Sequence, residues 1–109
     1  MTATHIELRI QDSTDPVTGE RLWAALAYAR AGERQHQVAD LEDAAFRLYL
    51  PMARTFAQGV TCDTAAERQA ADQAAELGLA DAVLGWRQPT SGGFRRFARS
   101  SILRHLLNR

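Results

Sequence analysis

The start of the chain alternates apolar and polar positions with a period of two. Three aliphatic side chains of residues 4–10 fall on one face, and two charged side chains fall on the other. The aliphatic residues are Ile6, Leu8 and Ile10, and the charged residues are Glu7 and Arg9. This period is typical of a strand with one buried face, so residues 4–10 are predicted to form a strand. A concentrated turn signal follows at residues 12–20.

Residues 21–30 fit two patterns. As a strand, they place one set of apolar side chains on one face, and Trp23 and small residues on the other. The first set is Leu22, Ala24, Leu26 and Tyr28. As a helix, they follow Asp15 as an N-cap and Pro16 at the first helical position, and their alanine content raises helix propensity.

A lone strand is not viable, because its backbone groups need hydrogen-bond partners. The strand at residues 4–10 can pair only with residues 21–30 and 35–39, which have the other β-like patterns. We therefore predict a three-stranded antiparallel meander, with residues 31–33 as its second turn. The helical interpretation of residues 21–30 remains the alternative.

From Asp40 onward the apolar positions recur at helical spacing. They are Leu41, Ala45, Leu48, Met52 and Phe56. Asp40 is a suitable N-cap, and Gly59 is a natural end for the helix. Pro51 lacks a backbone donor, so it is predicted to kink this helix or to start a second one.

A capping-box pattern at Thr64 and Glu67 predicts the start of the next helix, which should run to about Leu77. Its predicted inward face consists of small residues and one leucine. These are Ala66, Ala70, Ala74 and Leu77. Gly78 is predicted to end the helix, and residues 80–86 are predicted to form a short further one.

Residues 94–107 are predicted to form the last helix, after a hinge at residues 89–93 that contains Pro89 and two glycines. One face of this helix carries two phenylalanines, and the opposite face carries arginines. An apolar patch is rotated away from the phenylalanines and consists of Ile102, Leu103, Leu106 and Leu107. One patch can cover the domain itself, and the other needs a different partner.

Together these elements predict an α+β fold, in which a small N-terminal antiparallel sheet of two or three strands precedes three or four helices. At 109 residues the chain has room for one hydrophobic core and not for two. We therefore predict a single domain. Its parts are a β-meander (1–39), a helical core (40–88), a hinge (89–93) and a basic amphipathic C-terminal helix (94–109).

Charge is segregated along the chain. The first 86 residues hold all 13 Asp and Glu against seven Arg, whereas the last 23 residues hold six Arg and no acid. The basic residues are all Arg, which high-GC coding bias explains better than selection for bidentate recognition does, so the choice of Arg is not by itself evidence of a binding site. The basic end of the chain therefore faces either the protein's own acidic part or an acidic partner.

The predicted partner-binding residues combine arginines with leucines of the last helix. They are Arg87, Arg95, Arg96, Arg99, Leu103, Arg104, Leu106 and Leu107. The arginines would supply charge and the leucines would supply desolvated contact area. The expected partner is an acidic protein or a nucleoprotein complex, and homodimerisation through the same apolar patch fits equally well.

A second interpretation is a helix-turn-helix regulator that binds DNA. Ala74, Gly78 and Leu84 have the spacing of that motif's small residue, turn glycine and buried aliphatic residue. Residues 81–88 would then be the recognition helix. However, Asp81 stands where phosphates would approach, and Arg87 and Gln88 are the only readers in that segment.

No enzyme signature stands out, so no catalytic residue, metal site or cofactor is predicted. His5, His36 and His105 show no metal-ligand spacing with one another or with Cys62. The single cysteine cannot form an intramolecular disulfide. A third interpretation is an enzyme whose site forms at an oligomer interface.

The chain shows no signal peptide and no apolar run of about 20 residues that could cross a membrane. We therefore expect a cytoplasmic protein without membrane contact. The predicted function is non-catalytic binding, as an inhibitor or accessory factor that docks on a larger acidic partner through the basic C-terminal helix.

Overall fold

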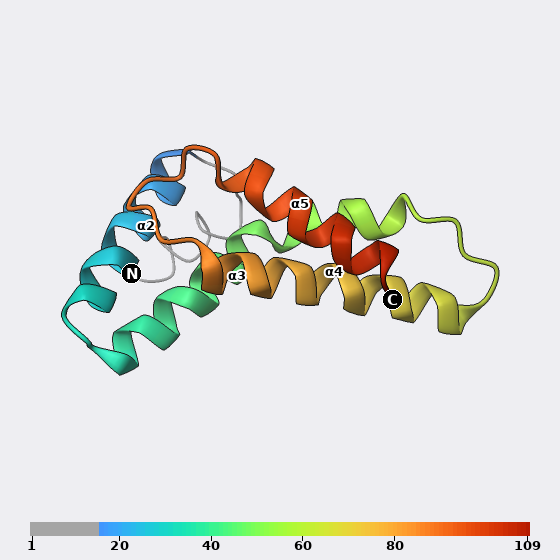
Figure 1. The fold of residues 1–109 in the computed structure, drawn as a ribbon, viewed down its shortest axis with the longest axis horizontal. Coiled ribbons are helices and arrows are strands. Elements are labelled where there is room, and N and C mark those ends of the chain that lie inside the picture. The colour runs from blue at the N-terminus through green and yellow to red at the C-terminus, as the bar shows by residue number, and fades with distance from the viewer. Residues whose placement is uncertain (1–15) are drawn as a thin grey trace, which may run out of the picture. The chain divides into compact units, whose positions relative to one another are not determined.

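The computed structural model describes residues 16–109, which form helices and their connections. The helices are α2 (Pro16–Ala31), α3 (Gln35–Gln58), α4 (Ala65–Gly85) and α5 (Phe94–Leu107) (Figure 1). These described residues contain no strand, so the predicted α+β class is wrong. Residues 21–30 and 35–39, predicted as strands, lie in α2 and α3. The predicted strand at residues 4–10 lies outside the described residues.

The burial pattern of α2 explains why its residues form a helix. Leu22, Trp23, Leu26 and Ala29 are all buried, at a spacing that places them on one helical face. A strand would point Trp23 away from Leu22 and Leu26, because side chains alternate between the two faces. The alternative interpretation, a helix that begins at Pro16, is confirmed.

The predicted hairpin turn instead joins two helices. The backbone N–H of Gly32 donates to the carbonyl of Tyr28 at 3.1 Å, and that of Glu33 donates to Arg30 at 3.2 Å. Glu33 has φ of 55°, the left-handed conformation that commonly ends a helix. α3 then begins at Gln35, before the N-cap predicted at Asp40.

The chain divides into two compact units. The described part of the first unit comprises residues 16–49 and 86–92, and the second unit comprises residues 50–85 and 93–109. α3 contributes to both units, and the boundary inside it falls next to Pro51. α3 continues through Pro51 as one helix and ends at Gln58, next to the predicted stop at Gly59.

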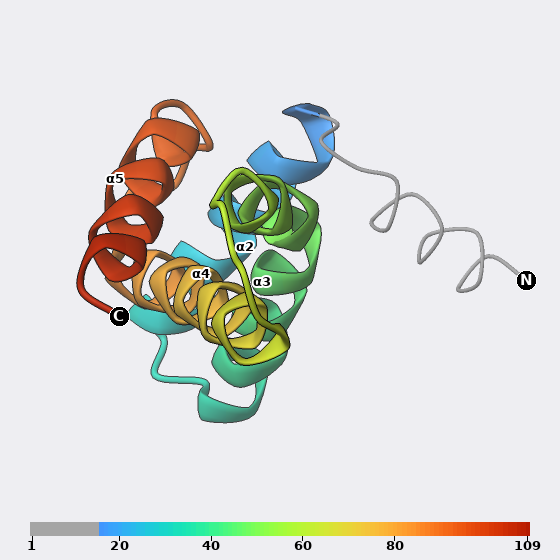
Figure 2. The same cartoon turned by 90° about the vertical axis from the view of Figure 1, so that its right-hand side faces the viewer.

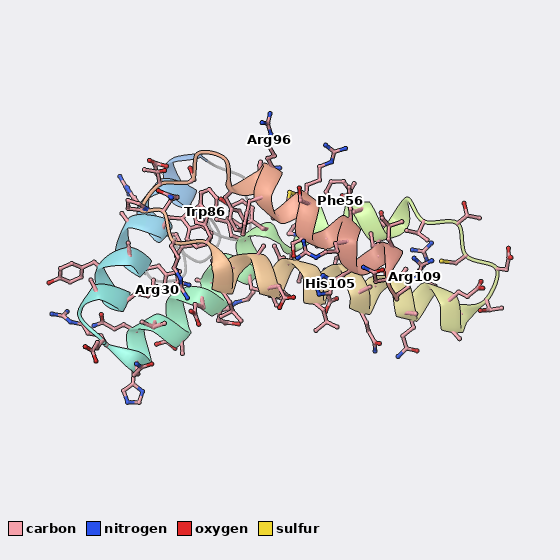
Figure 3. All side chains as sticks on the ribbon, viewed as in Figure 1. Arg30, Phe56, Trp86, Arg96, His105 and Arg109 are labelled. Atoms are coloured by element: carbon pink, nitrogen blue, oxygen red, sulfur yellow. The ribbon has the colours of Figure 1, made fainter. Side chains whose placement is uncertain are left out.

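The first unit is built around Trp23, which is fully buried. Its ring stacks on Tyr49 at a centroid distance of 6.5 Å and meets the edge of Trp86 at 6.4 Å. Arg30 donates to the carbonyl of Trp86 at 2.6 Å and pairs with Glu42 at 3.0 Å (Figure 3). These contacts connect α2, α3 and the segment after α4.

In the second unit, α4 begins at the predicted capping box. The backbone N–H of Glu67 donates to Thr64 Oγ1 at 3.0 Å, and the N–H of Thr64 donates to Glu67 Oε1 at 3.2 Å. α4 then runs without a break to Gly85. The predicted helix end at Gly78 and the predicted separate helix at residues 80–86 are therefore wrong.

α4 and α5 pack side by side and run in opposite directions (Figures 1 and 2). Gly78 lies in this contact, where a Cβ would come within 2.6 Å of Ile102 Cα. The buried Ser101 donates its hydroxyl to the Gly78 carbonyl at 2.7 Å. Gly78 is thus a contact point inside the helix, where only glycine lets the two backbones approach so closely.

This contact also corrects the inward face predicted for α4. Of its four predicted residues only Ala74 is buried, and Leu77 is 60% exposed. The buried face consists of Ala71, Ala74, Ala75, Gly78, Leu79, Ala82 and Val83. Alanine is abundant all around α4, so the apolar pattern did not distinguish the two faces; the position of Gly78 does.

Candidate partner-binding surface

α5 spans the same residues as the helix predicted from the sequence, Phe94–Leu107. Gly93 precedes it with φ of 87°, a left-handed conformation that favours glycine. The carbonyl of Gly93 accepts the N–H of Phe97 at 3.0 Å, and Phe94 is fully buried. The glycine and the buried ring together determine where α5 begins.

One face of α5 is buried in the second unit. Its residues are Phe94, Ala98, Ser101, Ile102 and Leu106. Leu106, one of the predicted partner-binding residues, is only 4% exposed and contributes to the core. The next residue, Leu107, is 84% exposed. The predicted apolar patch is therefore divided between the core and the surface.

The predicted arginines of α5 are all exposed. They are Arg95, Arg96, Arg99 and Arg104. Arg95 donates to the sulfur of Met52 at 3.7 Å, and Arg96 projects away from the helix (Figure 3). Within residues 16–109, the ion pairs involve other side chains, and Arg96, Arg99 and Arg104 make none with a carboxylate. Arg87 is also exposed but belongs to the first unit.

Two arginines and two leucines lie on one outward-facing side of α5. Arg96, Arg99, Leu103 and Leu107 follow one another at intervals of three and four residues, which places them on one helix face. We call these four residues the α5 stripe. Arg104 points about 100° further around the helix than Leu103. The stripe thus has a basic half near the start of α5 and an apolar half near its end.

The apolar half of the α5 stripe adjoins an open hollow next to the end of α3. Phe56 and Val60 line this hollow from one side, and Leu103 and Leu107 line it from the other. Its volume of about 510 Å³ is open to solvent. Phe56 and Val60 were not among the predicted partner-binding residues. Phe56 was instead grouped with the apolar positions that recur along its predicted helix, and only the tertiary structure places it beside Leu103.

A serine, a histidine and an aspartate come together between α4 and α5. His105 Nε2 lies 2.9 Å from Asp81 Oδ2, and its Nδ1 lies 2.9 Å from the backbone carbonyl of Ser101. The Ser101 hydroxyl donates to Gly78 instead. A nucleophilic serine needs a hydrogen bond from its own oxygen to the base. The cluster lacks that bond, so it does not have the geometry of a catalytic triad.

Other candidate chemistry is limited. Among residues 16–109, no group of three or more His, Cys, Asp or Glu side chains is arranged to hold a metal ion. Cys62 is half-buried, and its thiol contacts the carbonyl of Val60 at 3.6 Å. In the same part of the chain, every helix is too short or too polar to cross a bilayer.

The structure also changes the basis of the helix-turn-helix interpretation. Residues 81–85 are the last residues of the continuous α4, and residues 86–88 are not helical. Gly78 therefore makes no turn between two helices, and residues 81–88 do not form a separate recognition helix. Comparisons with known protein families, curated proteins and solved structures found no match to the chain.

Proposed function

We propose that the protein is a non-catalytic binding protein and that the α5 stripe docks on an acidic protein surface. The observation that carries the proposal is the exposure of Arg96 and Arg99 without a described carboxylate partner, in line with the exposed Leu107. Such a helix face combines charge for orientation with apolar area for contact. Leu106 has no part in this surface, because it is buried.

Helix stability does not account for the arginines. Arg95 and Arg96 lie in the first turn of α5, which contains no acidic residue. Positive charge at a helix N-terminus is unfavourable, by about 0.3–1 kcal/mol for an exposed side chain. Ion pairs between exposed side chains would stabilise the protein by only about 0–1 kcal/mol each. An interaction outside the unit is therefore the better explanation for so many arginines on one helix.

The leucines favour a protein partner over a nucleic acid. Phosphate contacts need charge and hydrogen-bond donors, whereas Leu103 and Leu107 offer neither. Beside them, Phe56 and Val60 widen the apolar area. A helix that presents anchors at intervals of three and four residues suits the groove of another protein. The expected partner surface is therefore an apolar groove with carboxylates at one end.

A photo-crosslinking experiment tests the proposal. Ser100 is exposed on α5, between Arg96 and Leu103, and would be replaced by a photo-crosslinking residue in the full chain. The same replacement at Gln69, which is exposed on α4, is the matched control. In cells that produce the protein, we expect the residue at position 100 to cross-link to a protein with an acidic surface. The residue at position 69 should form no such cross-link.

Charge reversal then shows whether the arginines are responsible. Arg96→Glu/Arg99→Glu in the same chain should abolish the cross-link at position 100, while circular dichroism shows that the helices are retained. A cross-link that survives this reversal contradicts the proposal, and so does the absence of any cross-linked protein. A cross-linked species that nuclease removes would instead support nucleic-acid binding, which a salt-dependent titration with duplex DNA would check.

A further inference from the structure

A second exposed surface lies on α4, away from the α5 stripe. Leu77 and Leu84 are 60% and 50% exposed. They are seven residues apart, so they lie two turns apart on one face of α4. A shallow hollow beside Leu77 is lined by Gln73 of α4 and by Asn108 after α5. Exposed apolar side chains that form a contiguous patch mark interaction sites, so this side of α4 is a candidate for one.

α5 continues this surface on its neighbouring side. The ring of Phe97 is 41% exposed and would lie 3.6 Å from a Cβ at Gly85. Arg104 follows Phe97 by seven residues and so lies on the same face of α5. The surface therefore has Leu77, Asp81 and Leu84 along α4, and Phe97 and Arg104 along α5, and Asp81 pairs with His105 of α5 at 2.9 Å. We call it the α4–α5 face.

The two helices of this face carry opposite charge. α4 contains four carboxylates and one arginine, whereas α5 contains four arginines and no carboxylate. A second copy that is turned so that its α4 lies on α5 of the first would bring the acidic helix next to the basic helix twice, with Arg104 as the arginine of α5 that lies on this face. This arrangement requires a two-fold axis that runs parallel to the helices along the α4–α5 face.

One ion pair of this arrangement can be named. Gly78 is level with Ser101 and Ile102, and the two helices are antiparallel (Figure 1). Counting two residues back along α4 and two or three residues forward along α5 places Glu76 level with Arg104. Glu76 points to the side of α4 that faces away from α5, because it precedes Gly78 by about half a turn. Within residues 16–109 neither side chain makes an ion pair. Rotation about the two-fold axis does not shift a residue along the helix direction. It therefore brings Glu76 of one copy next to Arg104 of the other.

We propose that the protein forms a symmetric homodimer through the α4–α5 face, with Leu77 and Leu84 at its centre and Glu76–Arg104 pairs at both edges. Most of the α5 stripe points away from this face, so the dimer leaves Arg96, Arg99 and Leu103 available. The dimer therefore does not depend on the function proposed above. It would present two α5 stripes to an acidic partner.

Light scattering coupled to size exclusion, over a concentration series of the full chain, tests the dimer. The wild type should approach twice the monomer mass as concentration rises. Leu77→Gln/Leu84→Gln should remain a monomer throughout, and circular dichroism should show unchanged helices because both side chains are exposed. Leu107→Gln is the matched control, since it removes an exposed leucine from the α5 stripe and should leave the dimer intact.

Charge reversals test the pairing. Glu76→Arg and Arg104→Glu should each weaken the dimer, because like charges then meet at both edges, and the double variant should restore it. A wild type that stays monomeric up to its solubility limit overturns the proposal. A dimer that survives Leu77→Gln/Leu84→Gln, or one that the double reversal fails to restore, overturns it as well. A dimer lost in Leu107→Gln but not in the α4 variant would place self-association on the α5 stripe instead.

Discussion

Gly78 and Ile102 bring the backbones of α4 and α5 into direct contact: a Cβ at Gly78 would lie 2.6 Å from Ile102 Cα and 2.9 Å from the Ser101 carbonyl oxygen. Neither atom belongs to a flexible side chain that could move aside. The close approach of the two antiparallel helices, which carry both proposed surfaces, therefore requires a residue without a side chain at position 78. The same contact turns Leu77 and Leu84 outward.

Gly78→Ala is expected to destabilise the protein. The added methyl must separate two packed backbones, and overpacking costs about 1–3 kcal/mol and at times more. The higher helix propensity of alanine than of glycine offsets only about 1 kcal/mol of this cost. Gly85→Ala in the same helix is the control, because its Cβ would meet the Phe97 ring at an ordinary 3.6 Å. Urea unfolding should separate the two variants; equal stabilities would contradict the close contact.

The adjacent residues Leu106 and Leu107 should respond very differently to truncation. Leu106→Ala removes a buried side chain and should cost about 2–5 kcal/mol of unfolding free energy. Leu107→Ala removes one that is 84% exposed and should change stability by about 0.5 kcal/mol or less. Thermal unfolding of both variants measures the difference. A larger loss for Leu107 would mean that the face of α5 is wrongly assigned.

The capping box of α4 should contribute measurably to stability. Thr64→Ala removes the oxygen that accepts the Glu67 N–H at 3.0 Å, which typically costs about 1 kcal/mol. The nearby Thr61 is exposed and lies outside the helix, so Thr61→Ala is the matched control and should change stability by about 0.5 kcal/mol or less. Chemical denaturation of the two variants checks the prediction.

Glu20 should make the stability of the first unit depend on pH. The backbone N–H of Ser91 donates to its carboxylate at 2.6 Å, and the Ser91 hydroxyl donates at 2.7 Å. Both hydrogen bonds lower the pKa of Glu20 below its ordinary value. A lowered folded-state pKa stabilises the protein above the unfolded pKa, and this contribution is lost as pH falls through the folded pKa.

Carboxyl NMR measures this effect directly. The signal of Glu20 should titrate at lower pH than in an unfolded peptide, and Ser91→Ala should raise its pKa by removing the hydroxyl contact. On acidification, the stability of the Glu20→Gln variant should decline less than that of the wild type. An unchanged Glu20 titration in Ser91→Ala would contradict the hydroxyl contribution.

The sequence predicted those elements whose signals are local. The capping box at Thr64 and Glu67, the helix end near Gly59 and the bounds of α5 depend on short-range hydrogen bonds and backbone conformation. It also located the arginines and leucines of α5. It misassigned residues 21–30, because alternate apolar positions fit a strand until the joint burial of Leu22 and Trp23 is known.

The sequence by itself thus determined that a basic, partly apolar helix follows a glycine, because charge, hydropathy and Gly93 are properties of neighbouring residues. Only the tertiary structure decided which leucines of that helix are exposed and which face of the alanine-rich α4 is buried. Many residues of α4 are small enough to pack inward. The choice between its faces rests on the approach of Ile102 to Gly78, two residues whose proximity no local pattern encodes.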